Sequence, residues 1–147
     1  HSDNYSLRSK VKRVKEIVDR DLGFVPSETT SPETRTVYLY IANKRVVGFA
    51  SAEIIKHAFV LHNSFERSTE PQNAMAGVHQ LWVHAKFRNQ GIATRLVDTI
   101  REKLVFGLTV PKVFLAFSSP TEAGARFARN YCGGDNGIKD ILVYDCT

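Results

Sequence analysis

The sequence predicts a single α/β (α+β) domain built on one mixed sheet, and three observations lead to that prediction. The chain has 147 residues, a common size for one domain with one core, so we expect a single domain over 1–147. Its apolar residues form short runs typical of strands and lie at helical spacing in three other segments. These segments follow one another as a helix, several strands, and then strand, helix, strand, helix and strand.

The first half of the chain predicts one helix and several antiparallel strands. Apolar positions at helical spacing predict a helix over 7–22. Two apolar runs, 37–42 and 45–53, flank a short turn and are expected to pair as a hairpin. A further strand is expected over 58–62. The polar segment 63–75 is expected to be a loop, and its length suggests a role in function or movement.

The second half is expected to alternate strands with helices. The run VFLAF is apolar throughout, which is typical of a strand in a sheet that is covered on both faces. The segment that begins at Ile92 places its apolar residues on one helical face. The expected elements are strands over 78–83, 113–117 and 141–144, and helices over 92–106 and 121–131.

Charge and cysteine content exclude some functions and leave others open. The net charge of +5 and the sequence pI near 9.4 fit an anionic partner, which includes chromatin, an acidic protein face or a polyphosphate. The two cysteines, Cys132 and Cys146, have no zinc-site spacing, so we expect reduced thiols and no metal in this domain. No apolar run is long enough to cross a bilayer and no secretory signal is present, so we expect no membrane partner.

The segment most indicative of chemistry is LWVHAKFRNQGIAT, where a strand runs through a tight turn into a helix. A helix N-terminus offers unpaired N–H groups and a positive dipole end, which together suit a diphosphate. Gly91 lets the backbone approach a phosphate, and Lys86 adds positive charge nearby. The residues expected to hold the diphosphate are Arg88, Asn89, Gln90, Gly91, Ile92, Ala93 and Thr94.

This turn matches one known nucleotide-binding signature and lacks two others. It has neither the Gly-Lys-Ser/Thr ending of a Walker A loop nor the other glycines of a dinucleotide fingerprint. It matches the R-x-x-G-x-A signature of the GNAT superfamily, which holds the pyrophosphate of coenzyme A. The alternative interpretation is an ordinary surface helix start. The position of the turn between an apolar strand and an amphipathic helix favours the cofactor site.

The wider sequence resembles the cohesin acetyltransferase family over nearly the whole chain. The run AFSSPTEAGARFA is similar to the family's A-F-S-x-P-T-x-x-G-x-x-x-A, which generic GNAT enzymes lack. The run GVHQLWV resembles the family's G-V-S-R-I-W-V strand. Further similar runs, in the family's order, are KEIVDRDLGF, KRVVGFASAE, YCGG and ILVY.

The resemblance implies a GNAT fold, with a mixed, mostly antiparallel central sheet flanked by helices. It also implies a protein-lysine N-acetyltransferase that uses acetyl-CoA. The implied partner is the SMC-type ATPase head of cohesin, with chromatin and the replication machinery as indirect partners, and the implied location is the nucleus. The family usually has a zinc finger before this domain, and no such pattern occurs here, so the chain resembles an excised catalytic domain.

Carried over by resemblance, the acetyl-CoA contacts extend to two further groups of residues. Backbone groups of Leu81, Trp82 and Val83 would meet the pantetheine arm and the thioester. The other side of the cofactor would be lined by Thr121, Glu122 and Ala123.

The general base stays open at this stage. His79 and Ser119 occupy the positions where vertebrate members of the family have a catalytic Ser and Asp. An imidazole has a suitable ordinary pKa, and Glu122, Asp98 and Glu53 are further candidates. Strict alternation along the strand would place His79 on the same face as Leu81 and Val83.

Two rival functions remain compatible with the sequence. One is a GNAT enzyme that acetylates another protein or a small amine, because a fold does not determine a substrate. The other is a basic nucleic-acid-binding module without catalysis. The second lacks any recognisable nucleic-acid-binding motif.

Overall fold

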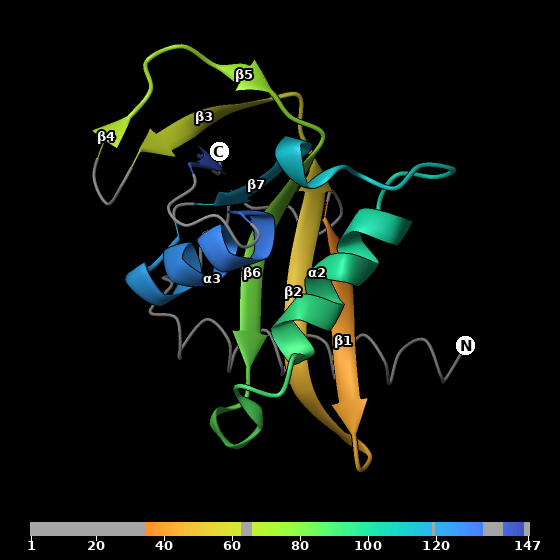
Figure 1. Ribbon diagram of the computed structural model, residues 1–147. Helices are drawn as coiled ribbons and strands as arrows, with labels where there is room; N and C mark the ends of the chain where they lie inside the picture. Colours follow the sequence, from red (N-terminus) through yellow and green to blue (C-terminus); the bar gives the residue numbers. More distant parts are fainter. Residues whose placement is uncertain (1–34, 63–65, 119, 134–139, 146–147) are drawn as a thin grey trace, which may run out of the picture.

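The computed structural model describes residues 35–62, 66–118, 120–133 and 140–145, so the helix predicted over 7–22 lies outside the described residues. One mixed sheet forms the centre of the described part (Figure 1). Its strands are β1 (Thr36–Ala42), β2 (Arg45–Ile54), β3 (His57–His62), β4 (Glu66–Arg67), β5 (Gln72–Asn73), β6 (Ala76–Val83), β7 (Leu115–Ser118) and β8 (Ile141–Tyr144). Two α-helices, α2 (Ile92–Lys103) and α3 (Glu122–Gly133), and two 3-10 turns, η2 (Ala85–Phe87) and η3 (Lys112–Phe114), complete it.

The sheet has the mixed, mostly antiparallel topology that the sequence predicts. Its strand order is β1-β2-β6-β7-β8-β3-β4, and β5 pairs with β3. The predicted hairpin of β1 and β2 is confirmed. Only the pairs β6–β7 and β7–β8 are parallel, and α2 and α3 are the crossover helices that parallel neighbours need.

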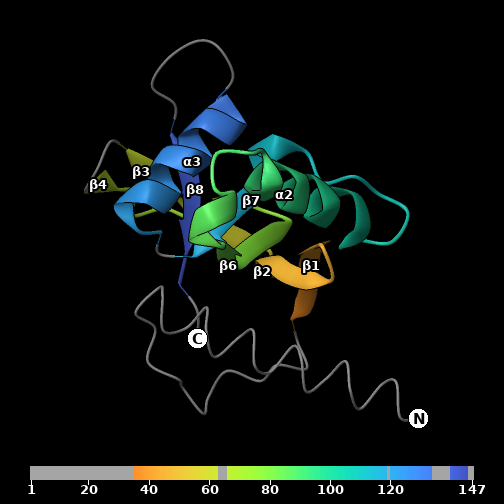
Figure 2. The same cartoon turned by 90° about the horizontal axis from the view of Figure 1, so that it is seen from below.

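Both helices pack on the same face of the sheet (Figures 1 and 2). The helical spacing read from the sequence is confirmed for α2, whose Val97 and Ile100 are fully buried against the sheet. Each such aliphatic side chain contributes about 1.5–3 kcal/mol by leaving water. No helix of the described residues is long and apolar enough to cross a membrane.

Two predicted boundaries are wrong, and each error has a local physical reason. The helix α2 ends at Lys103 rather than 106, and the chain then turns at Gly107, whose φ is 77°. The strand expected from 113 begins at Leu115, because the segment after Pro111 forms the 3-10 turn and leaves Val113 exposed.

The segment 63–75 is not loop throughout, because it includes the two-residue strands β4 and β5. Two hydrogen bonds between Ser68 and Val60 hold the end of the β4 segment against β3. The Ser68 N–H donates to the Val60 carbonyl at 2.7 Å, and the Val60 N–H donates to the Ser68 hydroxyl at 2.9 Å. Such pairing leaves no apolar alternation in the sequence, which is why the pattern predicted a loop.

A glycine sets how closely α2 approaches the sheet. A Cβ on Gly48 of β2 would lie 2.9 Å from Ile92 Cγ2 and 3.1 Å from Leu96 Cδ1. The first turn of α2 therefore rests directly on the backbone of β2. This contact fixes the height of the helix N-terminus above the sheet.

We expect Gly48→Ala to lower the free energy of unfolding by about 1–3 kcal/mol, because the added methyl overpacks the contact with Ile92 and Leu96. Urea denaturation measures the change. Arg45→Ala, at an exposed position at the start of the same strand, is the control and should change stability by less than about 0.5 kcal/mol. Equal stability of Gly48→Ala and the parent would contradict the close contact.

Candidate active site

The strands β6 and β7 separate after a short region of contact. They pair in parallel through three residue pairs, from Ala76 with Leu115 to Val78 with Phe117. Beyond this point β7 ends at Ser118, whereas β6 continues to Val83 along β2. Backbone groups of alternate strand residues point to opposite edges, so part of the β6 backbone beyond Val78 faces the opening.

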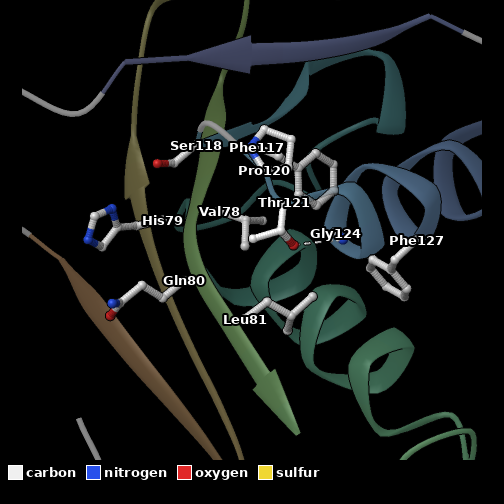
Figure 3. Close-up of a pocket in the computed structure, with 10 residues that line it drawn as sticks. All are labelled: Val78, His79, Gln80, Leu81, Phe117, Ser118, Pro120, Thr121, Gly124 and Phe127. Carbon is white, nitrogen blue, oxygen red and sulfur yellow. Dashed lines mark hydrogen bonds between the residues drawn. The ribbon is translucent and has the colours of Figure 1, made fainter. Parts of the chain in front are cut away.

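A cavity of about 90 Å³ lies at this separation (Figure 3). Leu81 of β6 and Phe117 of β7 line its two strand sides. Thr121, just before α3, and Gly124 and Phe127 of α3 line its helical side at a spacing of three residues. Sequence reasoning missed Gly124 and Phe127, although this spacing after Thr121 is a signal that could have indicated them.

The connection from β6 to α2 brings the helix N-terminus to the same end of the sheet. The backbone is left-handed at Asn89 (φ 63°) and at Gly91 (φ 81°), which is the N-cap of α2. No side chain caps this helix, so its first-turn N–H groups keep their capacity to bind an anion. A Cβ on Gly91 would meet no atom within 4 Å, so the space beside the N-cap is open.

The residues expected to hold a diphosphate occupy this open end, and most of them are exposed. Asn89, Gln90, Gly91 and Thr94 are exposed, whereas Ile92 is buried against the sheet and Ala93 is partly buried. An uncapped helix start with open space before it fits a diphosphate group.

Arg88 has a structural contact in addition to its charge. Its Nε donates to the carbonyl of Val83 at 3.0 Å, and this bond closes the turn between strand and helix. The His84 N–H donates to the Val47 carbonyl at 2.8 Å, which ties the same turn to β2. The path of the connection is therefore set before any ligand binds.

A β-bulge places His79 differently from what strict alternation predicts. Ser51 of β2 pairs with Gln80, but Ala52 pairs with Val78, so His79 is an extra residue in β6. As a result Val78, Leu81 and Val83 all pack toward the helices. His79 points away from them, on the side of Gln80 and Ser118 (Figure 3). The prediction that His79 shares a face with Leu81 and Val83 is wrong.

Trp82 also lies on the face away from the helices. Its ring packs with Phe49, which is fully buried on that face. Only the backbone of Trp82 is therefore available on the side of the cavity that α2 and α3 cover. Leu81 and Val83 are partly buried on the helical side of the strand.

The residues at the start of α3 stand at the entrance of the cavity. The Thr121 hydroxyl accepts a bond from the Gly124 N–H at 3.1 Å and so caps the helix. Glu122 is largely solvated, with 93% of its side chain exposed and its carboxylate 3.9 Å from Arg126. Ala123 is exposed, and Ser119 lies outside the described residues.

Asp98 lies between the helices, away from His79. Its carboxylate accepts a short hydrogen bond from the Tyr131 hydroxyl. Arg101 donates to the same hydroxyl at 3.2 Å. Burial and the bond to Asp98 raise the pKa of Tyr131 to about 12, so the phenol keeps its proton at neutral pH. These three residues join α2 to α3 beside a separate hollow of about 370 Å³.

The comparisons with known proteins agree with this geometry. The model of the ESCO1/2 acetyltransferase family matches residues 72–144. The chain is similar to N-acetyltransferase ESCO2 of Mus musculus, with 37% identity over 97% of this chain and 25% of the relative. It is also similar to N-acetyltransferase eso1 of Schizosaccharomyces pombe, with 30% identity over 92% of this chain and 17% of the relative. The chain thus spans about a quarter or less of these relatives.

A solved structure shows the same fold. The xEco2 acetyltransferase domain bound to a K105-CoA conjugate superposes with a TM-score of 0.87 and 34% identity. The match covers 97% of this chain and 87% of that one. The GNAT fold expected from the sequence is therefore confirmed.

We expect Gly91→Asp to weaken acetyl-CoA binding by about tenfold or more, because a carboxylate at the helix start repels a diphosphate and fills the space before it. Isothermal titration calorimetry measures the dissociation constant. Gly91→Asn is the matched control, since it has nearly the same size without the charge, and it should bind more tightly than Gly91→Asp. Binding by Gly91→Asp as tight as that of the parent would place the diphosphate elsewhere.

Proposed function

This chain belongs to the ESCO1/2 family of acetyltransferases, and from that premise we propose that it transfers the acetyl group of acetyl-CoA to lysine side chains of cohesin. The proposed substrate is the SMC-type ATPase head. The chain covers a quarter of the relative ESCO2. Acetylation of cohesin would take place in the nucleus, on chromatin.

The observation that carries the proposal is the cavity where β6 and β7 separate, together with the uncapped start of α2 at the same end of the sheet. The backbone beside the cavity suits an extended amide chain, and the helix start suits a diphosphate. Acetyl-CoA contains both chemistries in one molecule. The related xEco2 domain was solved with a K105-CoA conjugate, which supports the same assignment here.

Transfer requires a neutral amine, because a lysine ammonium has an ordinary pKa of about 10.4. As the N–C bond forms and the C–S bond breaks, the amine loses a proton and coenzyme A leaves as its thiol. Backbone N–H groups near Val83 are proposed to bind the oxygen that gains negative charge. Leu81 of the same strand lines the cavity, and β6 is paired with β2 as far as Val83.

His79 is the proposed proton acceptor. The bulge turns its side chain to the face opposite the helices, on the side of Ser118 (Figure 3). Acetyl-CoA on the helical side and a lysine arriving from the other side would then meet at the gap between the strands. The solvated Glu122 and the helix-bound Asp98 are less suitably placed for that approach.

The direct test is incubation of the chain with acetyl-CoA and a purified cohesin SMC head, with acetylated lysines identified by mass spectrometry. The proposal expects acetyl-CoA-dependent modification of a few lysines. A polyamine and double-stranded DNA serve as comparison ligands. Faster acetylation of the polyamine, or salt-dependent binding of DNA without acetyl transfer, would support a different function.

We expect His79→Ala to lower kcat by about 100-fold while acetyl-CoA affinity stays within about twofold of the parent, because the side chain acts on the amine rather than on the cofactor. In the parent, the rate should rise with pH as a neutral imidazole forms, and His79→Ala should lose this part of the pH dependence.

His62→Ala is the matched control for this variant. His62 is an exposed histidine at the end of β3 and forms a hydrogen bond with Asp140. Two strands, β7 and β8, separate β3 from β6 in the sheet, so the loss of His62 should leave kcat unchanged. An unchanged kcat and pH profile in His79→Ala would remove His79 from the mechanism.

A further inference from the structure

A tyrosine from the end of the chain reaches across the sheet on the face opposite the helices. The Tyr144 hydroxyl donates to Glu53 Oε2 at 3.0 Å. The same oxygen accepts a bond from Arg35 Nε at 3.1 Å. Tyr144 belongs to β8, Glu53 to β2, and Arg35 directly precedes β1.

The path of this tyrosine crosses the two strands that form the gap. The register aligns Glu53 with Gly77 of β6, and Gly77 with Ala116 of β7. A Cβ on Gly77 would lie 2.5 Å from ring carbons of Tyr144, so the ring lies directly on the glycine backbone. Ala116 packs in the same buried cluster as Tyr144. Gly77 and Ala116, which pair in register, are both small and so leave room for the Tyr144 ring.

Arg35, Glu53 and Tyr144 are largely buried, and the positive charge of Arg35 balances the negative charge of Glu53. The side chains of Arg35 and Glu53 are 7% and 20% exposed, and Tyr144 is 6% exposed. A carboxylate oxygen that already accepts from a guanidinium and a phenol is poorly placed to accept a proton from substrate. This geometry favours a structural role for Glu53 over the role of general base considered from the sequence.

We propose that Arg35, Glu53 and Tyr144 form a strut that positions the two edges of the cavity for acetyl transfer; the inference rests on the function proposed above. The half-sheet β1-β2-β6 and the half-sheet β7-β8-β3 are joined by the ladder of three residue pairs between β6 and β7. The strut joins the same two halves a second time, across that ladder.

The location of the strut explains why it affects chemistry. Tyr144 pairs in register with Ser118, the last residue of β7, and Gly77 lies two residues before the bulged His79. The substrate amine would enter between β6 near His79 and the end of β7 at Ser118, and Tyr144 contacts both strands close to these points. Small errors in such positions reduce rates strongly. Arg35, Glu53 and Tyr144 are positioning residues, because they act through β6 and β7.

The test is Tyr144→Phe, which keeps the ring on Gly77 and removes the hydroxyl that donates to Glu53. We expect kcat to fall by about tenfold or more, with acetyl-CoA affinity within about twofold of the parent, since the diphosphate site at α2 is untouched. Amide hydrogen exchange in β7 and in the first half of β6 should become faster by about tenfold. Glu53→Gln, which removes the charge from the shared acceptor, should change both measurements in the same direction.

Asp145→Asn is the matched control. Asp145 follows Tyr144 and forms an exposed pair with Arg67 at 3.0 Å, so its loss weakens the same strand end without touching the strut. It should leave kcat and exchange in β6 unchanged. An unchanged kcat in Tyr144→Phe, or an equal fall in Asp145→Asn, would overturn the proposal.

Hydrogen exchange separates this inference from the function on which it rests. If the parent acetylates no substrate, the proposed function fails, and the exchange data still decide whether the strut holds the ladder. Faster exchange in β6 and β7 of Tyr144→Phe would then support the strut. Unchanged exchange would overturn it.

Discussion

The parallel ladder between β6 and β7 is the contact on which the rest of the site depends. Three residue pairs hold the strands together, and beyond Val78 they separate. A longer ladder would close the cavity and satisfy the β6 backbone, whereas a shorter one would leave the two halves of the sheet poorly joined. The crossover helices α2 and α3 follow from the parallel order, and their N-termini lie at the end where the strands separate.

The two faces of the sheet then have different tasks. The helical face offers an uncapped helix start and a small apolar cavity, which suit the cofactor. The opposite face presents His79 and Ser118 (Figure 3). Ser118 pairs in register with Tyr144, whose ring lies on Gly77 of β6. The bulge at His79 is the device that turns one side chain from the first face to the second. Cofactor and amine would therefore approach the gap from different sides of one sheet.

Local patterns in the sequence predicted most of the described strands and helices, and they also pointed to the turn and helix start proposed for the diphosphate, because those signals are local. The turn around Arg88 and Gly91, between an apolar strand and an amphipathic helix, needs no distant partner to be recognised. The bulge was not predictable in this way, since it depends on which residues of β2 pair with β6. The bond between Tyr144 and Glu53 joins residues 91 positions apart, and no spacing indicates it. The family's catalytic position at Ser119 stays a prediction.

Acetyl-CoA is proposed to bind where β6 and β7 separate, with its diphosphate at the start of α2. The most direct measurement is a titration of the ¹⁵N-labelled chain with acetyl-CoA, followed by amide chemical shifts. For binding at this place we expect the largest shifts at Leu81 and Val83, in the turn from Asn89 to Thr94, and at the start of α3. Largest shifts in the groove between β1 and α2, with those amides unchanged, would contradict it.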